Sequence, residues 1–219
     1  VTLTNGANEF SSVDLVNIGS FGNVSVTEAD VAGNGLAIGG IADSLTADAG
    51  GALDFTSGTY TTLNGTAGGN ITQSGDLTVS DATTLTSNGA GIDVDLSTGS
   101  NNFDTVALMD GTGDFGAVTV SDTGDLEIGG DAATLNANAG GGLVFAGGNH
   151  TNLNGFSTGS ISQGGDLTVS GTAVFTAEAT GVTLNLNNSG NDFADVALAN
   201  GSGDFGFATV EIRPAFGPL

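Results

Sequence analysis

The stretch ITQSGDLTVS at residues 71–80 returns as ISQGGDLTVS at residues 161–170, ninety residues later. The correspondence continues without a gap in both directions. NNFDTVALMDGTGDFGAVTV (101–120) matches NDFADVALANGSGDFGFATV (191–210), and IADSLTADAGGALDF (41–55) matches DAATLNANAGGGLVF (131–145). An internal period of this length indicates a solenoid or a tandem array. We therefore expect a protein that acts first as a shape or a surface.

The composition points to an all-β chain with a real core. The 219 residues include 39 Gly, which disfavours long helices. Thr, Val, Ile and Phe favour strands, whereas Asn, Asp and Gly favour tight turns. Hydrophobic residues make up 38% of the chain, which is enough to build an interior and argues against disorder.

The charge balance excludes several partners. There are 24 Asp and Glu, one Arg and no Lys, for a formal net charge of -23. Such a chain does not fit the phosphates of nucleic acid, nor an anionic lipid surface. No run approaches the roughly 18 apolar residues of a membrane helix, so we expect no membrane insertion. The acidic excess is typical of a soluble extracellular surface, while the lack of Cys leaves the redox compartment open.

Short apolar segments bounded by Gly, Asn, Asp or Ser predict the strands, as in DLTV (76–79), TVAL (105–108) and GLVF (142–145). Ninety residues divide into about five rungs of roughly 18–20 residues, where a rung is one full turn of the coil. The whole chain would hold about 11–12 rungs and extend on the order of 55 Å. We expect a single solenoid over residues 1–212 and a Pro-containing tail at 213–219. A β-sandwich or barrel is the competing fold.

The first copy is slightly out of step with the second. TEADVAGNGLAIGG (27–40) aligns with SDTGDLEIGG (121–130) and is four residues longer. Insertions of this kind belong in a loop on the outside of a solenoid. Val1 enters in mid-pattern, because VTLTNGANEF (1–10) resembles VTLNLNNSGNDF (182–193). We therefore expect either a mature product or a piece of a longer array.

The repeated segments ITQSGDLTVS, NNFDTVALMDGTGDFGAVTVSDTGDLEIGG and GNDFADVALANGSGDFG resemble the repeats of filamentous-haemagglutinin-like exoproteins, a family of bacterial surface proteins. The resemblance spans about residues 8 to 212. It implies a right-handed parallel β-helix, export across the bacterial envelope, a place outside the cell or on its surface, and a role as an adhesin or extended fibre. It supplies no catalytic residues.

One repeated loop is a candidate calcium site. Asp110-Gly-Thr-Gly-Asp114 recurs as Asn200-Gly-Ser-Gly-Asp204. Oxygen side chains around glycines suit Ca²⁺, and Asp110, Asp114 and Asp204 are the candidate ligands. The alternative is an acidic turn whose Asp and Gly residues serve the backbone. We expect no other cofactor.

Three other features receive structural interpretations. His150, the only histidine, replaces Tyr60 of the preceding copy, which predicts a loop or a half-exposed packing position and not a catalytic base. Phenylalanines that recur with the period predict core packing. Leu63-Asn-Gly and its counterpart Leu153-Asn-Gly predict turns with positive φ.

The function predicted from these patterns is that of a non-catalytic, exported structural solenoid, adhesin-like or assembling end to end into a filament. The tail offers the assembly residues Arg213, Pro214, Phe216, Pro218 and Leu219. The partners expected are further copies, a longer parent chain, or a receptor or glycan. The alternatives are a polysaccharide lyase or hydrolase on a β-helix, and an ice- or Ca-binding solenoid. No unrepeated cluster of Asp with His or Arg is evident along the chain to favour an enzyme.

Overall fold

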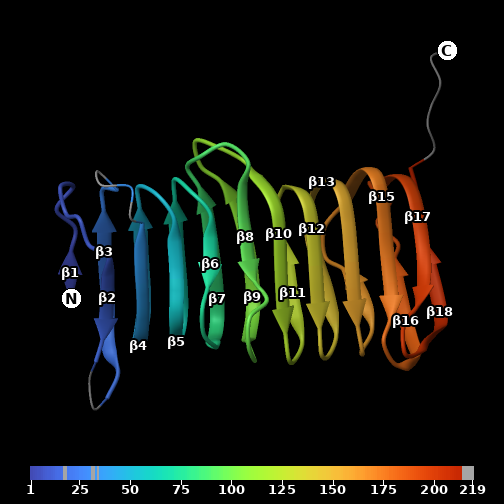
Figure 1. Ribbon diagram of the computed structural model, residues 1–219. Helices are drawn as coiled ribbons and strands as arrows, with labels where there is room; N and C mark the ends of the chain where they lie inside the picture. Colours follow the sequence, from blue (N-terminus) through green and yellow to red (C-terminus); the bar gives the residue numbers. More distant parts are fainter. Residues whose placement is uncertain (17–18, 31–32, 34, 214–219) are drawn as a thin grey trace.

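A computed structural model describes residues 1–16, 19–30, 33 and 35–213. The described chain is all β, with no helix, and its parallel strands stack as a β-solenoid of about 10 rungs. The first and last strands lie at opposite ends of the stack (Figure 1). In the described residues there is accordingly no helix long and apolar enough to cross a membrane.

The described residues form eighteen strands, and all but those at the two ends of the stack pair in parallel with strands of the rungs above and below. Their bounds are β1 Thr2–Leu3, β2 Ser12–Leu15, β3 Phe21–Glu28, β4 Leu36–Ala49, β5 Leu53–Ala67, β6 Ile71–Gln73, β7 Leu77–Ser87, β8 Ile92–Leu96, β9 Asn102–Asp110, β10 Phe115–Asp122, β11 Leu126–Gly129, β12 Ala132–Ala139, β13 Leu143–Ser157, β14 Ile161–Gln163, β15 Leu167–Ala177, β16 Thr180–Leu186, β17 Asp192–Asn200 and β18 Asp204–Val210.

The strand register shows how long each rung is. Leu36 pairs with Leu53 in the next rung, and Val94 pairs with Val118, so the second of these rungs is clearly longer than the first. The expectation of nearly equal rungs was therefore wrong, because the loops between strands differ in length. About 10 rungs, and not 11–12, account for the chain. At about 4.8 Å per rung the stack is about 48 Å long.

Two columns of inward-facing residues run along the stack. One passes through Leu36, Leu53, Ile71, Val94, Val118, Leu135 and Leu153. The other passes through Val24, Leu45, Leu63, Thr83, Val106, Ile128 and Phe145. The two columns face each other across the core. Phe145 belongs to the second column and Phe175 lies on the side of the first, and their rings meet edge to face with centroids 5.9 Å apart.

The ninety-residue period is four and a half rungs and not the five expected from its length. Starting at Leu45, four steps of the second column reach Ile128, and the fifth reaches Phe145. Leu135, the counterpart of Leu45, belongs to the first column, because it pairs with Val118. Equivalent residues of successive copies therefore lie on opposite sides of the coil.

The extra half-rung is one strand, β10, with the sequence FGAVTVSD. It has counterparts in β3 (FGNVSVTE) and β18 (DFGFATV). Val24 of β3 pairs in the second column and Val118 of β10 in the first. Ala208 of β18 pairs with Leu184, Leu184 with Ile161, and Ile161 with Leu143, which lies beside Phe145 on strand β13. Strand β18 therefore lies on the side of the second column. The half-rung thus alternates sides from copy to copy.

The core follows the strict alternation of inward and outward residues, as in the BeBeB burial pattern of β8. The recurring phenylalanines line the core as expected. Phe55, Phe103, Phe115, Phe145 and Phe193 are buried, whereas Phe10 and Phe205 are half-buried against the same core. The four-residue insertion falls between β3 and β4, and residues 31–32 and 34 within it lie outside the described part of the chain.

The Leu-Asn-Gly segments are not turns, so that prediction was wrong. Gly65 lies inside the 15-residue strand β5 and points into the core. A Cβ added there would be 2.9 Å from the Phe55 ring, which reaches across from the facing column. Gly155 stands in the same relation to Phe145. These glycines make room for an aromatic ring and do not bend the chain.

Candidate functional site

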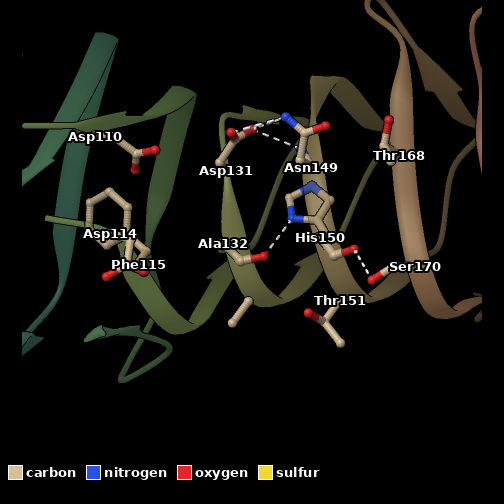
Figure 2. A pocket seen from close by; sticks show the side chains of 11 residues that line it. Asp110, Asp114, Phe115, Asp131, Ala132, Asn149, His150, Thr151, Thr168 and Ser170 are labelled. Carbon is tan, nitrogen blue, oxygen red and sulfur yellow. Dashed lines mark hydrogen bonds between the residues drawn. The ribbon is translucent and has the colours of Figure 1, made fainter. Parts of the chain in front are cut away.

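An open groove of about 420 Å³ lies near the middle of the stack. It runs across four successive strands, from the loop before β10 to β15 (Figure 2). Its lining combines three carboxylates, several hydroxyls and one imidazole, contributed by Asp110, Asp114, Phe115, Asp131, Ala132, Ala133, Asn149, His150, Thr151, Thr168 and Ser170.

His150 is the most unusual residue in this lining. Its side chain is only 5% exposed, because strand alternation points it inward between Ala132 and Val169 of the neighbouring rungs. Nδ1 lies 3.2 Å from the Ala132 carbonyl oxygen and must donate to it, since a carbonyl only accepts. Nε2 is then an acceptor, and it has no hydrogen-bond partner among the described residues.

The expectation of a half-exposed position at His150 was therefore wrong. Burial lowers the pKa of His150, and the hydrogen bond to Ala132 and the charge of Asp131 only partly oppose this. Tyr60, its counterpart on the other side of the coil, is also buried, and burial raises the pKa of its phenol. The two rings fill the same kind of corner, over Gly58 and Gly148, where a Cβ would meet the ring.

Two of the three carboxylates in the groove accept hydrogen bonds from the protein itself. Asp131 Oδ1 accepts the Asn149 main-chain N–H at 2.8 Å, and both oxygens of Asp131 accept its side-chain amide at 3.0 Å (Figure 2). Asp114 Oδ1 accepts the N–H of Gly91 at 2.7 Å, where the backbone has positive φ. These contacts orient the loops and leave the outer carboxylate surface facing solvent.

The calcium candidates behave as loop-ordering residues. Asp204 Oδ1 accepts the N–H of Gly181 at 3.0 Å, which repeats the contact between Asp114 and Gly91. Asp110 lies on the rim of the groove. Among the residues that the structure describes, no group of three or more His, Cys, Asp or Glu is arranged to hold a metal ion. The carboxylates of Asp114 and Asp204 thus order the neighbouring loop by accepting its N–H groups.

Sequence reasoning missed this cluster because its members come from four consecutive rungs. Asp131 takes the place of Ile41 in the preceding copy, and His150 that of Tyr60. The stack brings both substitutions to one groove. Two steps would have revealed that Asp131 and His150 share a groove. The first is to compare the copies for acids that do not repeat, and the second is to add the rung lengths to find which residues become neighbours.

A second missed feature is a buried pair of amides that occurs once in each copy. Gln73 and Asn101 exchange two side-chain hydrogen bonds of 2.8 Å each across a separation of 28 residues. Gln163 and Asn191 do the same. Asn101 and Asn191 also accept the main-chain N–H of Leu77 and Leu167. We call each pair with its contacts an amide clasp. The clasp explains why the ITQ and ISQ segments are so closely repeated.

Of the proposed assembly residues, the structure describes only Arg213. Pro214, Phe216, Pro218 and Leu219 lie outside the described residues. The main-chain N–H of Arg213 donates to the Asn191 carbonyl at 2.7 Å, beyond the end of β18.

Comparisons with known proteins agree with this picture of repeated units. No curated protein matches the chain. No solved structure matches it either. A family model described as "Repeats of unknown function (DUF5649)" matches residues 42–110 and 130–200. The two matched segments are the two copies, and the half-rung β10 lies between them. The chain therefore belongs to the family of DUF5649 repeats.

Proposed function

We propose that this protein is a non-catalytic structural rod, exported to the cell surface or beyond it, which holds apart whatever is attached to its two ends. The observation that carries the proposal is the unbroken parallel ladder from β1 to β18. Every rung is bonded to the next by backbone hydrogen bonds that run along the axis, so that axial load falls on many bonds at once.

The surface location rests on different support. The likeness to filamentous-haemagglutinin-like repeats and the net charge of -23 both suit an exposed bacterial protein. An adhesin-like role, or end-to-end assembly into a filament, is the finer form of the same proposal. Receptors or glycans are the partners that this role requires.

A length experiment tests the rod directly. Duplicating residues 111–200 adds one whole period, which should lengthen the particle by about 22 Å, because four and a half rungs are added at about 4.8 Å each. Small-angle scattering on the parent and the extended protein measures this change. An extended protein that becomes wider and not longer would refute the rod. Antibody labelling of intact cells of the producing organism tests export separately.

The polysaccharide-acting alternative has one observation in its favour, the unrepeated groove at His150. Two of its three carboxylates, Asp114 and Asp131, are bonded to the protein's own N–H groups, and the described part of the chain has no Arg or Lys near them to stabilise developing charge. Turnover of any member of a polysaccharide panel, lost in Asp131→Asn, would replace our proposal with the enzyme.

A further inference from the structure

The acidic residues of this chain are unevenly distributed over the surface of the coil. Two outward-facing ladders alternate with Leu45, Leu63 and their column partners on strands β3, β4, β5, β7 and β9. They are Ser25, Thr46, Asn64, Thr84 and Ala107, and Thr27, Asp48, Thr66, Thr86 and Met109. We call these ten positions face A.

The second copy builds the same surface on the other side of the coil. Its ladders lie on strands β10, β12, β13, β15 and β17. They are Thr119, Asn136, Asn154, Val174 and Ala197, and Ser121, Asn138, Phe156, Thr176 and Ala199. We call these ten positions face B. The half-rung is the reason that the two faces point in opposite directions.

Faces A and B are almost free of charge. Of the chain's 24 acidic residues, only Asp48 occurs among these twenty positions. The side chains are mainly hydroxyls and amides, and they bond along the axis where they can. In face B, Asn154 donates to Asn136 Oδ1 at 2.8 Å, and Asn136 donates to Thr119 Oγ1 at 3.3 Å. By contrast, strand β8 presents Asp93 and Asp95 on the side of the coil away from face A, and Asp95 pairs with Thr119 one row beyond the end of face B.

We infer that face A is a lateral docking surface for a second copy of this chain, face A against face A. Two molecules of charge -23 repel each other in most orientations, and the neutral faces are where that repulsion is least. Both partners have the same rung spacing of about 4.8 Å, so rows of Thr and Asn on one can sit between rows on the other along the whole contact. A two-fold contact of this kind centres on the middle row, which holds Asn64 and Thr66.

The dimensions of the face set the strength of the contact. Five rungs span about 24 Å and the two neighbouring ladders about 14 Å, so face A covers on the order of 300 Å² per chain. A stable interface buries about 800 Å² per partner. Pairing of this chain alone is therefore weak, and in a longer array it strengthens with each further period that is engaged.

The test uses the absence of native Cys. Asn64→Cys places one thiol at the centre of face A, and Thr72→Cys places one on the other column, where Thr72 Oγ1 lies 3.1 Å from an oxygen of Asp54. Both variants are oxidised at high protein concentration in about 0.5 M NaCl, which reduces the Debye length to a few ångströms. Disulfide-linked dimer should form at least tenfold faster in Asn64→Cys, and faster in high salt than in low salt.

Two second-site variants separate docking from thiol reactivity. Thr84→Asp adds a charge one row from Asn64 and should return the dimer rate of Asn64→Cys to that of Thr72→Cys. Asp48→Asn removes the only carboxylate of face A and should increase the rate. Equal rates in Asn64→Cys and Thr72→Cys, or no response to Thr84→Asp in a protein with an unchanged circular dichroism spectrum, would overturn the inference. The inference would also be overturned if Asn64→Cys stayed monomeric and a neutral polysaccharide shielded its thiol from oxidation. None of these outcomes depends on export or on rod length.

Discussion

The amide clasp gives a sharp test of how the rungs are held in register. The change is Asn101→Ala. The Asn101 side chain is 1% exposed. Its oxygen accepts the Gln73 amide at 2.8 Å and the Leu77 N–H at 3.0 Å, and its nitrogen donates to Gln73 Oε1 at 2.8 Å and to the Leu96 carbonyl at 2.9 Å. Truncation leaves these partners buried without Asn101.

Each buried group that loses its partner costs about 1–3 kcal/mol. Gln73 keeps its bonds to the carbonyls of Gly75 and Thr98, so its nitrogen stays satisfied. The Leu77 N–H and Gln73 Oε1 remain as the main losses, and we expect the free energy of unfolding to fall by about 3–5 kcal/mol.

The assay is urea unfolding at pH 7 followed by far-UV circular dichroism, with hydrogen exchange to locate the loss. Exchange should accelerate first around residues 73–77 and 96–101, because a solenoid can open locally. Asn102→Ala, at the exposed neighbour, is the matched control and should change stability by less than about 0.5 kcal/mol. If Asn101→Ala and Asn102→Ala unfold at the same urea concentration, the clasp does not hold the register.

The sequence predicted the architecture well where a single rung determines it. Alternation within DLTV and GLVF, the many Gly and Asn boundaries and the period itself were enough to expect a parallel solenoid with buried phenylalanines. The number of rungs per period was not predictable, because a sequence period counts residues, whereas the steps from Leu36 to Leu53 and from Val94 to Val118 show that rungs differ in length.

The site was harder to predict for the same physical reason. Which residues become neighbours depends on the sum of several loop lengths. The half-rung in each period places Asp131 and His150 on the opposite side of the coil from Ile41 and Tyr60, and an estimate of five whole rungs misses this. The role of Gly65 was missed because its reason, the Phe55 ring, comes from the facing column.

Three further perturbations follow from individual buried groups, each to be read by urea unfolding. Thr83 and Ser87 have buried hydroxyls without a partner among the described residues, and the second copy has Ala173 and Ala177 in their places. Thr83→Val and Ser87→Ala should therefore each raise the free energy of unfolding by about 1 kcal/mol. A loss of stability would contradict this. Gly65→Ala should lower stability by about 1–3 kcal/mol because its Cβ would meet the Phe55 ring, whereas Gly6→Ala, with open space around it, should be nearly neutral. Burial lowers the pKa of His150 below its unfolded value of about 6.5. The neutral form therefore stabilises the fold above that pH, and this contribution is lost as the pH falls through 6.5 and below. The free energy of unfolding of His150→Tyr should fall less than that of the parent between pH 7.5 and pH 5, and parallel pH profiles would refute the assignment.

The half-rung is tested most directly by a distance between equivalent residues of the two copies. Spin labels on Cys introduced at Thr46 and Asn136, ninety residues apart, report which side of the coil each occupies. With four and a half rungs per period the labels point in opposite directions, and their separation combines about 22 Å along the axis with the width of the coil and both label arms. A Thr46 and Ala107 pair, three rungs apart on one ladder, calibrates the same-side case at about 14 Å along the axis. For Thr46 and Asn136 we predict a distance of more than about 30 Å, because the coil width and the label arms add to the axial rise. A distance of about 24 Å, as for five whole rungs on one side, would contradict the account.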